Sequence, residues 1–250
     1  MLINSLISEK TFNEWAPERL KAISQQFDSS PPHDLIRWGS EIFGADLVMA
    51  TGFGPEGIVL LHILAQIAPQ TTVFYLDTDL LFPETYELRD KLEKRLGLRF
   101  TRVRGELSLN DQARRHEPEL WAKQPDRCCR LRKVEPLRRF LSDKRAWITA
   151  IRRDQTAARA NADLVEWDLT NQLVKINPLA GWTSKQVWTY LLEHGLPYNP
   201  LHDRGYPSLG CWPCTHAVLP GADPRSGRWA GHTKTECGIH LQLPPESPAA

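Results

Sequence analysis

The chain of 250 residues is 41% hydrophobic and 24% charged, with a formal net charge of +1 at pH 7, which excludes a disordered chain and a fibrous repeat. No run approaches the roughly 18 apolar residues that cross a bilayer, and Glu9 and Lys10 interrupt the N-terminus before a secretory signal could form. Five cysteines are too few for a disulfide scaffold, so we expect a cytoplasmic protein without a membrane partner, in which cysteines bind a metal or catalyse a reaction.

Predicted helices and strands alternate along most of the chain. Residues 1–45 have the apolar spacing of two amphipathic helices, which the segment 29–32 separates. Further helices are predicted to end at residue 67, to cover 83–96 and to end at 194, the last with its N-cap at Thr183 or Ser184, and strands are predicted at 46–50, 73–76, 99–104, 146–151 and 173–176. This alternation predicts an α/β fold with a mostly parallel, twisted sheet and helices on both faces.

Positive charge is concentrated in one stretch of the chain. Residues 102–159 contain 16 of the 31 Lys and Arg residues but only 8 of the 30 acidic ones, which gives this stretch a net charge of +8. Such a cluster favours an anionic partner, although a solvated basic helix face explains it equally well. The near-neutral balance of the whole chain argues against a dedicated nucleic-acid binder, and we expect no nucleic-acid partner.

Two polar segments follow predicted strands, at the edge where parallel sheets bind ligands. The segment 51–57, TGFGPEG, places a glycine-rich turn before a helix, where free backbone N–H groups form an anion site. It is neither a Walker A loop nor a GxGxxG motif, and a tight turn that needs glycine is the alternative. The segment 76–79, LDTD, either faces a ligand or only caps the next helix.

Four cysteines form two pairs in distant parts of the sequence. Cys128 and Cys129 are adjacent, and Cys211 and Cys214 form a CxxC motif. Four thiolates from two segments suit an iron–sulfur cluster. Structural zinc is the first alternative, although its ligand pairs are normally separated by two to four residues, unlike adjacent cysteines. Unligated thiols in the core are the second alternative.

A fifth cysteine lies near the C-terminus. Cys237 belongs to the segment 234–240, KTECGIH, between Lys234 and His240. Neighbouring positive charge lowers the pKa of a thiol, and thiolates are nucleophiles, so Cys237 is a candidate catalytic residue. A surface cysteine without a function is the alternative, and an isolated histidine such as His240 is more often structural.

These motifs together resemble one family, the assimilatory adenylyl-sulfate (APS) and phosphoadenylyl-sulfate (PAPS) reductases. The resemblance covers about residues 45–240, and the combination of CC, CxxC and the ECGIH ending is highly specific. The matching segments are TGFGPEG at 51–57, LDTDLLFPETYEL at 76–88, CCRLRK at 128–133, IRRDQTAARA at 151–160, INPLAGWTSKQVWTYLLEHGLPYNPLHDRGYPSLGC at 176–211, CWPC at 211–214, RSGRW at 225–229 and KTECGIH at 234–240.

The resemblance implies a fold, a reaction and a cofactor. The fold is the adenine-nucleotide-binding sheet of the ATP pyrophosphatases, and the reaction is the thiol-dependent reduction of APS to sulfite and AMP in sulfate assimilation. Members with both cysteine pairs usually use APS, with PAPS or both nucleotides as the alternative. By the resemblance, Cys128, Cys129, Cys211 and Cys214 bind a [4Fe–4S] cluster. We expect this cluster to act electrostatically and structurally rather than by electron transfer.

The resemblance also implies the roles of individual residues. Cys237 is the nucleophile and forms a thiosulfonate, which a separate thioredoxin or glutaredoxin resolves. The implied organisation is a helical segment at 1–45, a nucleotide-binding reductase domain with the cluster site at 46–215, and a catalytic tail at 216–250. The oligomeric state, monomer or homo-oligomer, stays open. The residues implied to bind substrate are Gly52, Gly54, Glu56, Leu76, Lys133, Arg152, Arg153, Arg225, Arg228 and His240.

The sequence departs from the family pattern near the expected nucleotide. Asp79 stands where the family usually has glycine, and Pro55 and Gly57 make an unusual glycine-rich turn. A carboxylate near the ribose 3′ position repels an added 3′-phosphate, by about 1 kcal/mol or more when partly desolvated. Asp79 is therefore expected to favour APS over PAPS.

Two other functions compete with the reductase. An ATP pyrophosphatase that thiolates tRNA shares the fold, but it normally needs an SGGxDS-type loop, which residues 51–57 do not provide. A zinc-bearing nucleic-acid module that uses the basic stretch is the non-enzymatic alternative. Metal analysis separates this module from the reductase, because the reductase should contain iron and sulfide instead of zinc.

Overall fold

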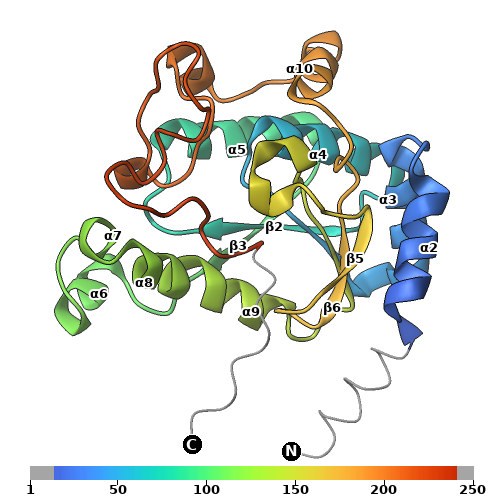
Figure 1. The fold of residues 1–250 in the computed structure, drawn as a ribbon, viewed down its shortest axis with the longest axis horizontal. Helices are drawn as coiled ribbons and strands as arrows, with labels where there is room; N and C mark the ends of the chain where they lie inside the picture. Colours follow the sequence, from blue (N-terminus) through green and yellow to red (C-terminus); the bar gives the residue numbers. More distant parts are fainter. Residues whose placement is uncertain (1–13, 241–250) are drawn as a thin grey trace, which may run out of the picture.

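The computed structural model describes residues 14–240, which form a sheet covered by helices on both faces (Figure 1). The strands are β1 Leu47–Ala50, β2 Thr72–Asp77, β3 Phe100–Arg104, β4 Ala146–Ile148, β5 Val165–Asp168 and β6 Leu173–Ile176. The α-helices are α2 Pro17–Phe27, α3 Pro32–Phe43, α4 Pro55–Ile67, α5 Pro83–Leu96, α6 Leu109–Arg115, α7 Leu120–Lys123, α8 Pro125–Cys129, α9 Glu135–Leu141 and α10 Ser184–Glu193.

The sheet has the strand order β3-β2-β1-β4-β6-β5. Neighbouring strands are parallel from β3 to β6, and β5 pairs with β6 in the antiparallel direction at the edge. The chain adds β2 and β3 on one side of β1 and then returns to place β4 on the other side. The strand order therefore reverses at β1, and parallel sheets bind ligands beside the carboxyl ends of strands at such a point.

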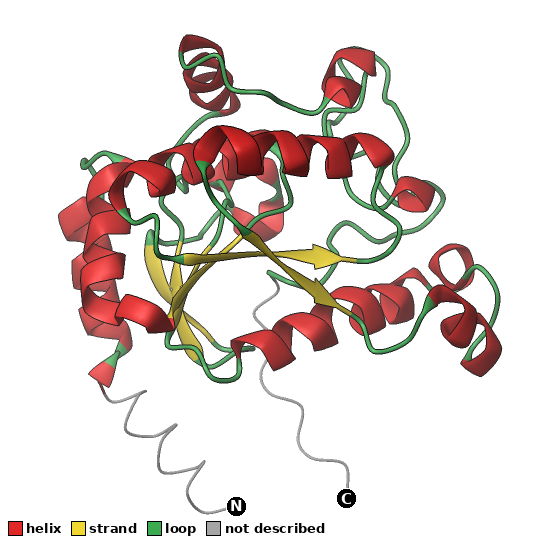
Figure 2. Cartoon of the chain, turned by 180° about the vertical axis from the view of Figure 1, so that it is seen from behind, coloured by secondary structure: helices red, strands yellow, loops and turns green. Residues whose placement is uncertain are grey.

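Two apolar layers hold the sheet between its helices. The larger one packs α2, α3, α4 and α10 on one face, and α4 is so apolar that the segment 57–61 is buried throughout. The smaller one includes Val48, Phe74 and Trp147 of the sheet and Leu137 and Leu141 of α9. Figure 1 shows α4 and α5 above the sheet and α6–α9 below it, and Figure 2 shows the same layers from behind. The predicted α/β fold is confirmed.

Several local predictions are refined by the structure. Residues 1–13 of the predicted helical segment lie outside the described part, and α2 and α3 confirm the two helices in the rest. β4 ends at Ile148, three residues before the predicted end, and the next residues form a loop whose first residue, Thr149, still donates to the Ile176 carbonyl of β6 (2.8 Å). The edge strand β5 and the short helices between residues 109 and 141 were not predicted. Thr183 is the N-cap of α10, and its capping box with Gln186 confirms the predicted start.

Among the described residues 14–240, no helix is both long and apolar enough to cross a membrane.

Candidate active site

The loops after β1 and β4 meet where the strand order reverses. After β1, the Phe53 N–H donates a hydrogen bond to Thr51 Oγ1 (3.1 Å), and Phe53 adopts a positive φ of 57°. α4 then begins at Pro55, and Glu56 in its first turn forms an ion pair with Arg152 from the loop after β4. This ion pair joins the glycine-rich turn to the second loop at the sheet edge, by which we mean the edge formed by the carboxyl ends of the parallel strands.

The end of β2 carries a buried carboxylate network. Asp77 is 0% exposed, and its carboxylate accepts hydrogen bonds from the Tyr86 hydroxyl (2.7 Å), the Arg102 guanidinium and the Asp79 N–H (2.9 Å). Burial and the hydrogen bond to Asp77 raise the pKa of Tyr86, so its hydroxyl keeps its proton and donates. Because a buried carboxylate needs such partners, Asp77 fixes the path of the chain after β2.

Replacing Asp77 by alanine is expected to lower the free energy of unfolding by about 2–3 kcal/mol, because the Tyr86 hydroxyl and the Asp79 N–H lose their acceptor. Urea denaturation measures this change. The control is Asp90→Ala, since Asp90 is half exposed and pairs only with the neighbouring Arg89, an interaction worth less than about 1 kcal/mol. Equal losses in the two variants would contradict a structural role of the Asp77 network.

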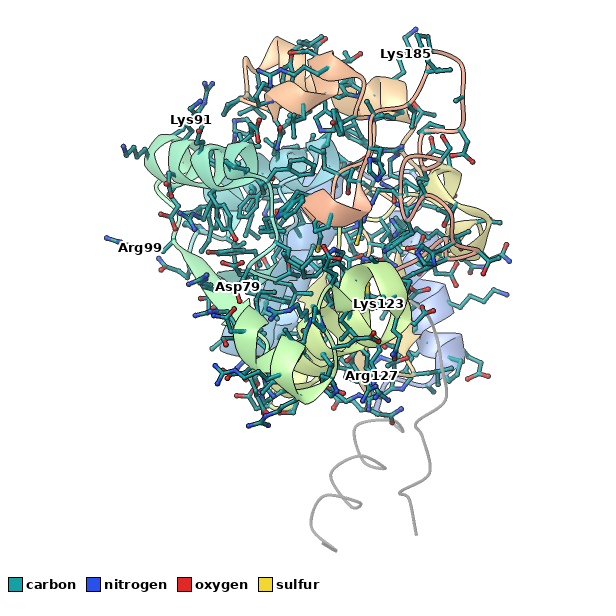
Figure 3. All side chains as sticks on the ribbon, turned by 90° about the vertical axis from the view of Figure 1, so that its left-hand side faces the viewer. Asp79, Lys91, Arg99, Lys123, Arg127 and Lys185 are labelled. Atoms are coloured by element: carbon teal, nitrogen blue, oxygen red, sulfur yellow. The ribbon has the colours of Figure 1, made fainter. Side chains whose placement is uncertain are left out.

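Asp79 follows this network with a φ of 58°, a left-handed conformation in which glycine is least strained. Its carboxylate lies 3.0–3.2 Å from guanidinium nitrogens of Arg102, Arg104 and Arg132. Figure 3 shows Asp79 between α5 and the helices α6–α8. Three cations therefore surround Asp79, and Arg102 is shared with Asp77. Positive charge still exceeds negative charge here, so the expected repulsion of a 3′-phosphate by Asp79 loses its physical basis.

The two cysteine pairs line one pocket beside the end of β2. Cys128 and Cys129 are the last residues of α8, while Cys211 and Cys214 come from the loop after α10. The sulfur of Cys211 lies 3.2 Å from Thr78 Oγ1, within hydrogen-bond distance. The pocket is completed by Leu80, Trp121, Pro125, Arg132, Lys133 and Trp229.

The thiols of this pocket need a compensating positive charge. Burial, followed by repulsion from the neighbouring sulfurs, raises the pKa of Cys128 to about 12 and that of Cys214 to about 11. A bound metal supplies positive charge and deprotonates its thiol ligands, so the donor set fits an iron–sulfur group. Within residues 14–240, no group of three or more Cys, His, Asp or Glu side chains is arranged to hold a metal ion. The fit therefore rests on the chemistry of the four thiols.

Lys133 lies between this pocket and Cys237. It belongs to a wide, π-helical turn, Arg130–Val134, that directly follows α8. Burial alone lowers the pKa of its ammonium group, but Cys211, Cys237 and Cys129 outweigh burial and raise it. Lys133 therefore stays charged, and one ammonium group faces both the paired thiols and the tail thiol.

Cys237 has the electrostatic environment of a nucleophile. Burial alone raises the pKa of its thiol, but the Lys133 ammonium, the Ile239 N–H and the Arg228 guanidinium together lower it below the ordinary value. The thiolate is the nucleophilic form, so a lowered pKa increases the reactive fraction at neutral pH.

The two residues expected to activate Cys237, Lys234 and His240, are paired with another group or uncharged. Lys234 forms an ion pair with Asp126 of α8. Burial and the charge of Arg159 hold the pKa of His240 well below its ordinary range, so this imidazole is neutral. Lys133 and Arg228 are therefore the cations that mainly lower the pKa of Cys237, in place of the predicted Lys234 and His240.

The alkylation rate of Cys237 by iodoacetamide is expected to rise with pH to a plateau, with its midpoint below the pKa of about 8.5 of an unperturbed cysteine. Replacing Lys133 by methionine should move the midpoint upward, because the cation that opposes burial is lost. Mass spectrometry of the tail peptide measures the rate. The control is Lys144→Met, because Lys144 lies away from the site and pairs with Asp143. An equal midpoint in the two variants would contradict the role of Lys133.

The end of the tail docks on the sheet. Ile239 packs against the smaller core, and the His240 ring stacks on Trp147 of β4 with centroids 5.7 Å apart. Gly238 has a φ of 96°, which favours glycine, and a Cβ there would lie 3.2 Å from Val134 Cγ2. Gly238 thus permits the turn that follows the thiol.

Three arginines, called the tail arginines (Arg159, Arg225 and Arg228), surround this segment. Nη2 atoms of Arg159 and Arg225 lie 2.8 and 3.4 Å from the Glu236 carboxylate. The Nε atoms of all three and Nδ1 of His240 are buried without a hydrogen-bond partner among the described residues. Burial and repulsion from Arg228 and Arg159 outweigh the attraction of Glu236 and lower the pKa of Arg225. Because each unpaired buried donor costs about 1–3 kcal/mol, an anion that accepts from these groups is stabilised.

The structure brings the predicted substrate residues together in two groups. Lys133, Arg225, Arg228 and His240 lie around Cys237. Gly52, Gly54, Glu56 and Arg152 lie at the sheet edge, and Leu76 packs on the smaller core that Ile239 also contacts. Arg153 differs from its neighbour, because its Nε donates to the Ala162 carbonyl (2.8 Å) within its own loop.

Some residues of the site were not predicted. Arg159 lies in the IRRDQTAARA segment and Glu236 precedes the tail cysteine, yet only the structure shows that they pair. Arg132 is almost fully buried and donates to the Thr78 carbonyl (2.9 Å) beside the thiol pocket. Each of these residues lies in a segment that resembles the family, and this position was the only sign in the sequence that they belong to the site. Their interaction partners depend on the tertiary structure.

The site thus combines loops at the carboxyl ends of parallel strands with a thiol of lowered pKa among cations, an arrangement that suits sulfur chemistry on an anionic group. The family model for the phosphoadenosine phosphosulfate reductase domain matches residues 46–217, more than half of the chain. The chain belongs to this family, and the resemblance inferred from its motifs is confirmed.

Individual relatives agree with this assignment. The adenosine 5′-phosphosulfate reductase of Salinibacter ruber is 56% identical over 235 residues, 93% of each chain. The phosphoadenosine 5′-phosphosulfate reductase of Gloeobacter violaceus is 46% identical and covers 88% of this chain and 93% of its own. The crystal structure of a PAPS reductase from Candida auris matches with a TM-score of 0.70 and 29% identity, over 81% of this chain and 98% of that one. An FMN adenylyltransferase from Candida glabrata shares the fold alone, with a TM-score of 0.53 and 16% identity over 76% of this chain and 63% of its own.

Proposed function

We propose that this protein reduces adenylyl sulfate to sulfite and AMP in assimilatory sulfate reduction, with Cys237 as the nucleophile. The observation that carries the proposal is the position of Cys237, whose thiol has a lowered pKa and lies among the tail arginines. A phosphosulfate group carries two negative charges, which the unpaired guanidinium donors can accept. The 56% identity to a protein named an APS reductase supports this substrate.

The chemistry proceeds in two displacement steps. The Cys237 thiolate attacks the sulfur of the sulfuryl group, an S–S bond forms, and AMP leaves with the electron pair of the broken S–O bond. A thiolate of thioredoxin or glutaredoxin then attacks the Cys237 sulfur and displaces sulfite, which keeps the electron pair of the S–S bond. The second thiol of the redoxin resolves the mixed disulfide, so the redoxin dithiol supplies both electrons.

The cations around Cys237 lower the barrier of the first step. A thiolate meets an anionic group there, so preorganised positive charge is needed. We assign Lys133, Arg225, Arg228 and His240 to the phosphosulfate, with the neutral His240 ring contributing a hydrogen bond through Nδ1. Arg159 joins this group on the basis of its unpaired buried Nε.

The adenosine part is assigned to the sheet edge. Gly52 and Gly54 expose backbone groups there, and Leu76 supplies an apolar contact where β2 ends. The ion pair of Glu56 with Arg152 keeps the two loops together. Arg153 supports its own loop through Ala162 in this proposal.

We further propose that Cys128, Cys129, Cys211 and Cys214 hold a [4Fe–4S] cluster. Four thiols line one pocket, three of them buried and that of Cys214 partly exposed, with no carboxylate or imidazole among the described lining residues, and this supports the donor set. When bound, the cluster supplies a charged group that polarises its surroundings and cross-links two distant segments. Lys133 compensates its negative charge, and neither displacement step takes electrons from it.

The proposal includes a setting for the enzyme. All five cysteines are free, which suits the reducing cytoplasm where redoxins act. The proposed organisation is a helical segment at 1–45, a nucleotide-binding reductase domain with the cluster site at 46–215 and a catalytic tail at 216–250.

The decisive test is sulfite release by anaerobically purified protein, with APS and PAPS assayed in parallel and thioredoxin as the reductant. We expect higher catalytic efficiency with APS, the substrate after which the Salinibacter relative is named. Equal or higher efficiency with PAPS would assign the alternative substrate. Release of sulfite from neither nucleotide would overturn the proposed function.

A further inference from the structure

Glu236, the residue before Cys237, is a buried charged side chain of the tail. Glu236 is 7% exposed, and its carboxylate accepts a hydrogen bond from the Thr156 hydroxyl (3.0 Å). The same carboxylate bonds to Arg159 (2.8 Å) and lies 3.4 Å from Arg225. Thr156 and Arg159 belong to the loop after β4, so Glu236 ties the tail to the sheet edge next to the nucleotide site.

Glu236 leaves binding capacity on the arginines that it contacts. A guanidinium group offers five N–H donors in a rigid fork. Glu236 accepts a hydrogen bond from Nη2 of Arg159, and it lies 3.4 Å from Nη2 of Arg225, which donates to the Thr235 carbonyl (2.7 Å). The Nε atoms of both arginines are buried and have no partner among residues 14–240. The Nε donors of the same two guanidinium groups are therefore left for another acceptor while Glu236 stays in place.

The charge balance points in the same direction. The tail arginines and Lys133 carry four positive charges, and Glu236 and the Cys237 thiolate carry two negative ones. Lys133 also faces the thiol pocket, but a net positive charge remains around the tail with Glu236 in place, and it favours an anion such as a phosphosulfate group. Binding of this anion therefore requires no displacement of Glu236.

We propose that Glu236 is a positioning residue, which holds the tail on Arg159 and Thr156 so that Cys237 faces the bound anion, and which shares the arginines with that anion. This inference rests on the proposed function. Cys237 directly follows Glu236, so the docked carboxylate fixes the backbone that carries the thiol. Correct placement of two reacting groups contributes strongly to rate, and a loosely held thiol loses this contribution.

The test separates substrate binding from chemistry in Glu236→Gln. Binding of APS is measured in the Cys237→Ser background, and formation of the thiosulfonate is measured in a single turnover without redoxin. We expect the dissociation constant to change by less than about threefold and thiosulfonate formation to slow by about 30-fold or more, because the thiol is no longer held in place. Binding tightened about tenfold or more would show that Glu236 competes with the anion, and this result would overturn the proposal. An unchanged rate of thiosulfonate formation would also overturn it.

Two further measurements show the docking itself. In Glu236→Gln, the plateau rate of Cys237 alkylation at high pH and the hydrogen exchange of the peptide 233–240 should both increase, because the tail dissociates more often. Thr156→Val removes one of the hydrogen bonds and should give a smaller increase in both. Unchanged exchange and alkylation in both variants would overturn docking by Glu236.

The controls distinguish positioning from misfolding and from a wrong function. Glu193→Gln, at the exposed end of α10, makes the same chemical change away from the tail and should match the wild type in every readout. Equal melting temperatures and iron contents show that the Glu236 variant is folded. A wild-type protein that forms no thiosulfonate would refute the proposed function, while exchange and alkylation would still decide whether Glu236 docks the tail.

Discussion

The Cys237→Ser protein is expected to bind APS and to lose at least about a thousandfold in sulfite release, because a serine hydroxyl is hardly ionised at neutral pH and makes a poor nucleophile without a base. The tail arginines and Lys133 are unchanged in this variant, so the positive site for the phosphosulfate remains. Sulfite production with thioredoxin measures the reaction, and calorimetric titration with APS measures binding. Substantial turnover by this variant would refute the assigned nucleophile.

The same experiment without a reductant identifies the intermediate. Wild-type protein incubated with APS alone should gain the mass of one SO3 group, and proteolysis should place this mass on the peptide that contains Cys237. The serine variant should gain no mass. An adduct on any of the other cysteines would contradict the mechanism even if sulfite is released.

Replacing Cys128, Cys129, Cys211 or Cys214 by serine is expected to remove most of the bound iron, because each would lose one of four thiolate ligands. Anaerobic wild-type protein should contain iron and acid-labile sulfide in equal amounts, about four of each per chain. Metal and sulfide analysis, together with the visible absorption of the protein, measures this effect. Loss of the cluster should also loosen the contact between α8 and the loop that carries Cys211.

Cys237→Ser is the matched control for the cluster variants, since it makes the same substitution at the fifth cysteine and should keep its iron. Full iron content in Cys211→Ser would remove that residue from the ligand set. Zinc in place of iron and sulfide would refute the cluster and revive structural zinc as the occupant of the pocket.

The parallel part of the sheet was predictable because its strands are buried on both faces. Such strands read as short continuous apolar runs, and the segments 46–50 and 73–76 have this pattern. β5, Val165–Asp168, was missed because it alternates apolar and charged residues at the antiparallel edge. The short helices before α9 were missed because they are too brief for a periodic signal.

The identities of the site residues were easier to predict than their partners. Cys237 and Lys133 lie in recognisable motifs, and the structure places them together. The sequence could not show that Lys234 turns to Asp126, because the direction of a side chain is set by packing against distant segments. For the same reason, the three cations around Asp79 were not foreseen.

The sequence left two explanations open for the basic stretch at 102–159, an anionic partner or a basic surface without a ligand, and the structure separates its residues into two groups. Arg102, Arg104 and Arg132 meet at Asp79 and support the end of β2. Lys133 faces the thiols instead. Part of the positive charge therefore holds the structure together, and part of it is available to an anion.

The wide turn Arg130–Val134 adds one residue to the helical turn between α8 and α9. Successive residues of an α-helix point about 100° apart, so this single residue sets the rotation of α8 relative to α9. α8 directs Cys128 and Cys129 into the thiol pocket, while α9 directs Leu137 into the smaller core. A deletion of one residue in this turn would rotate the two helices against each other. The variant could then place Cys128 and Cys129 in the thiol pocket or Leu137 in the smaller core, but not both at once.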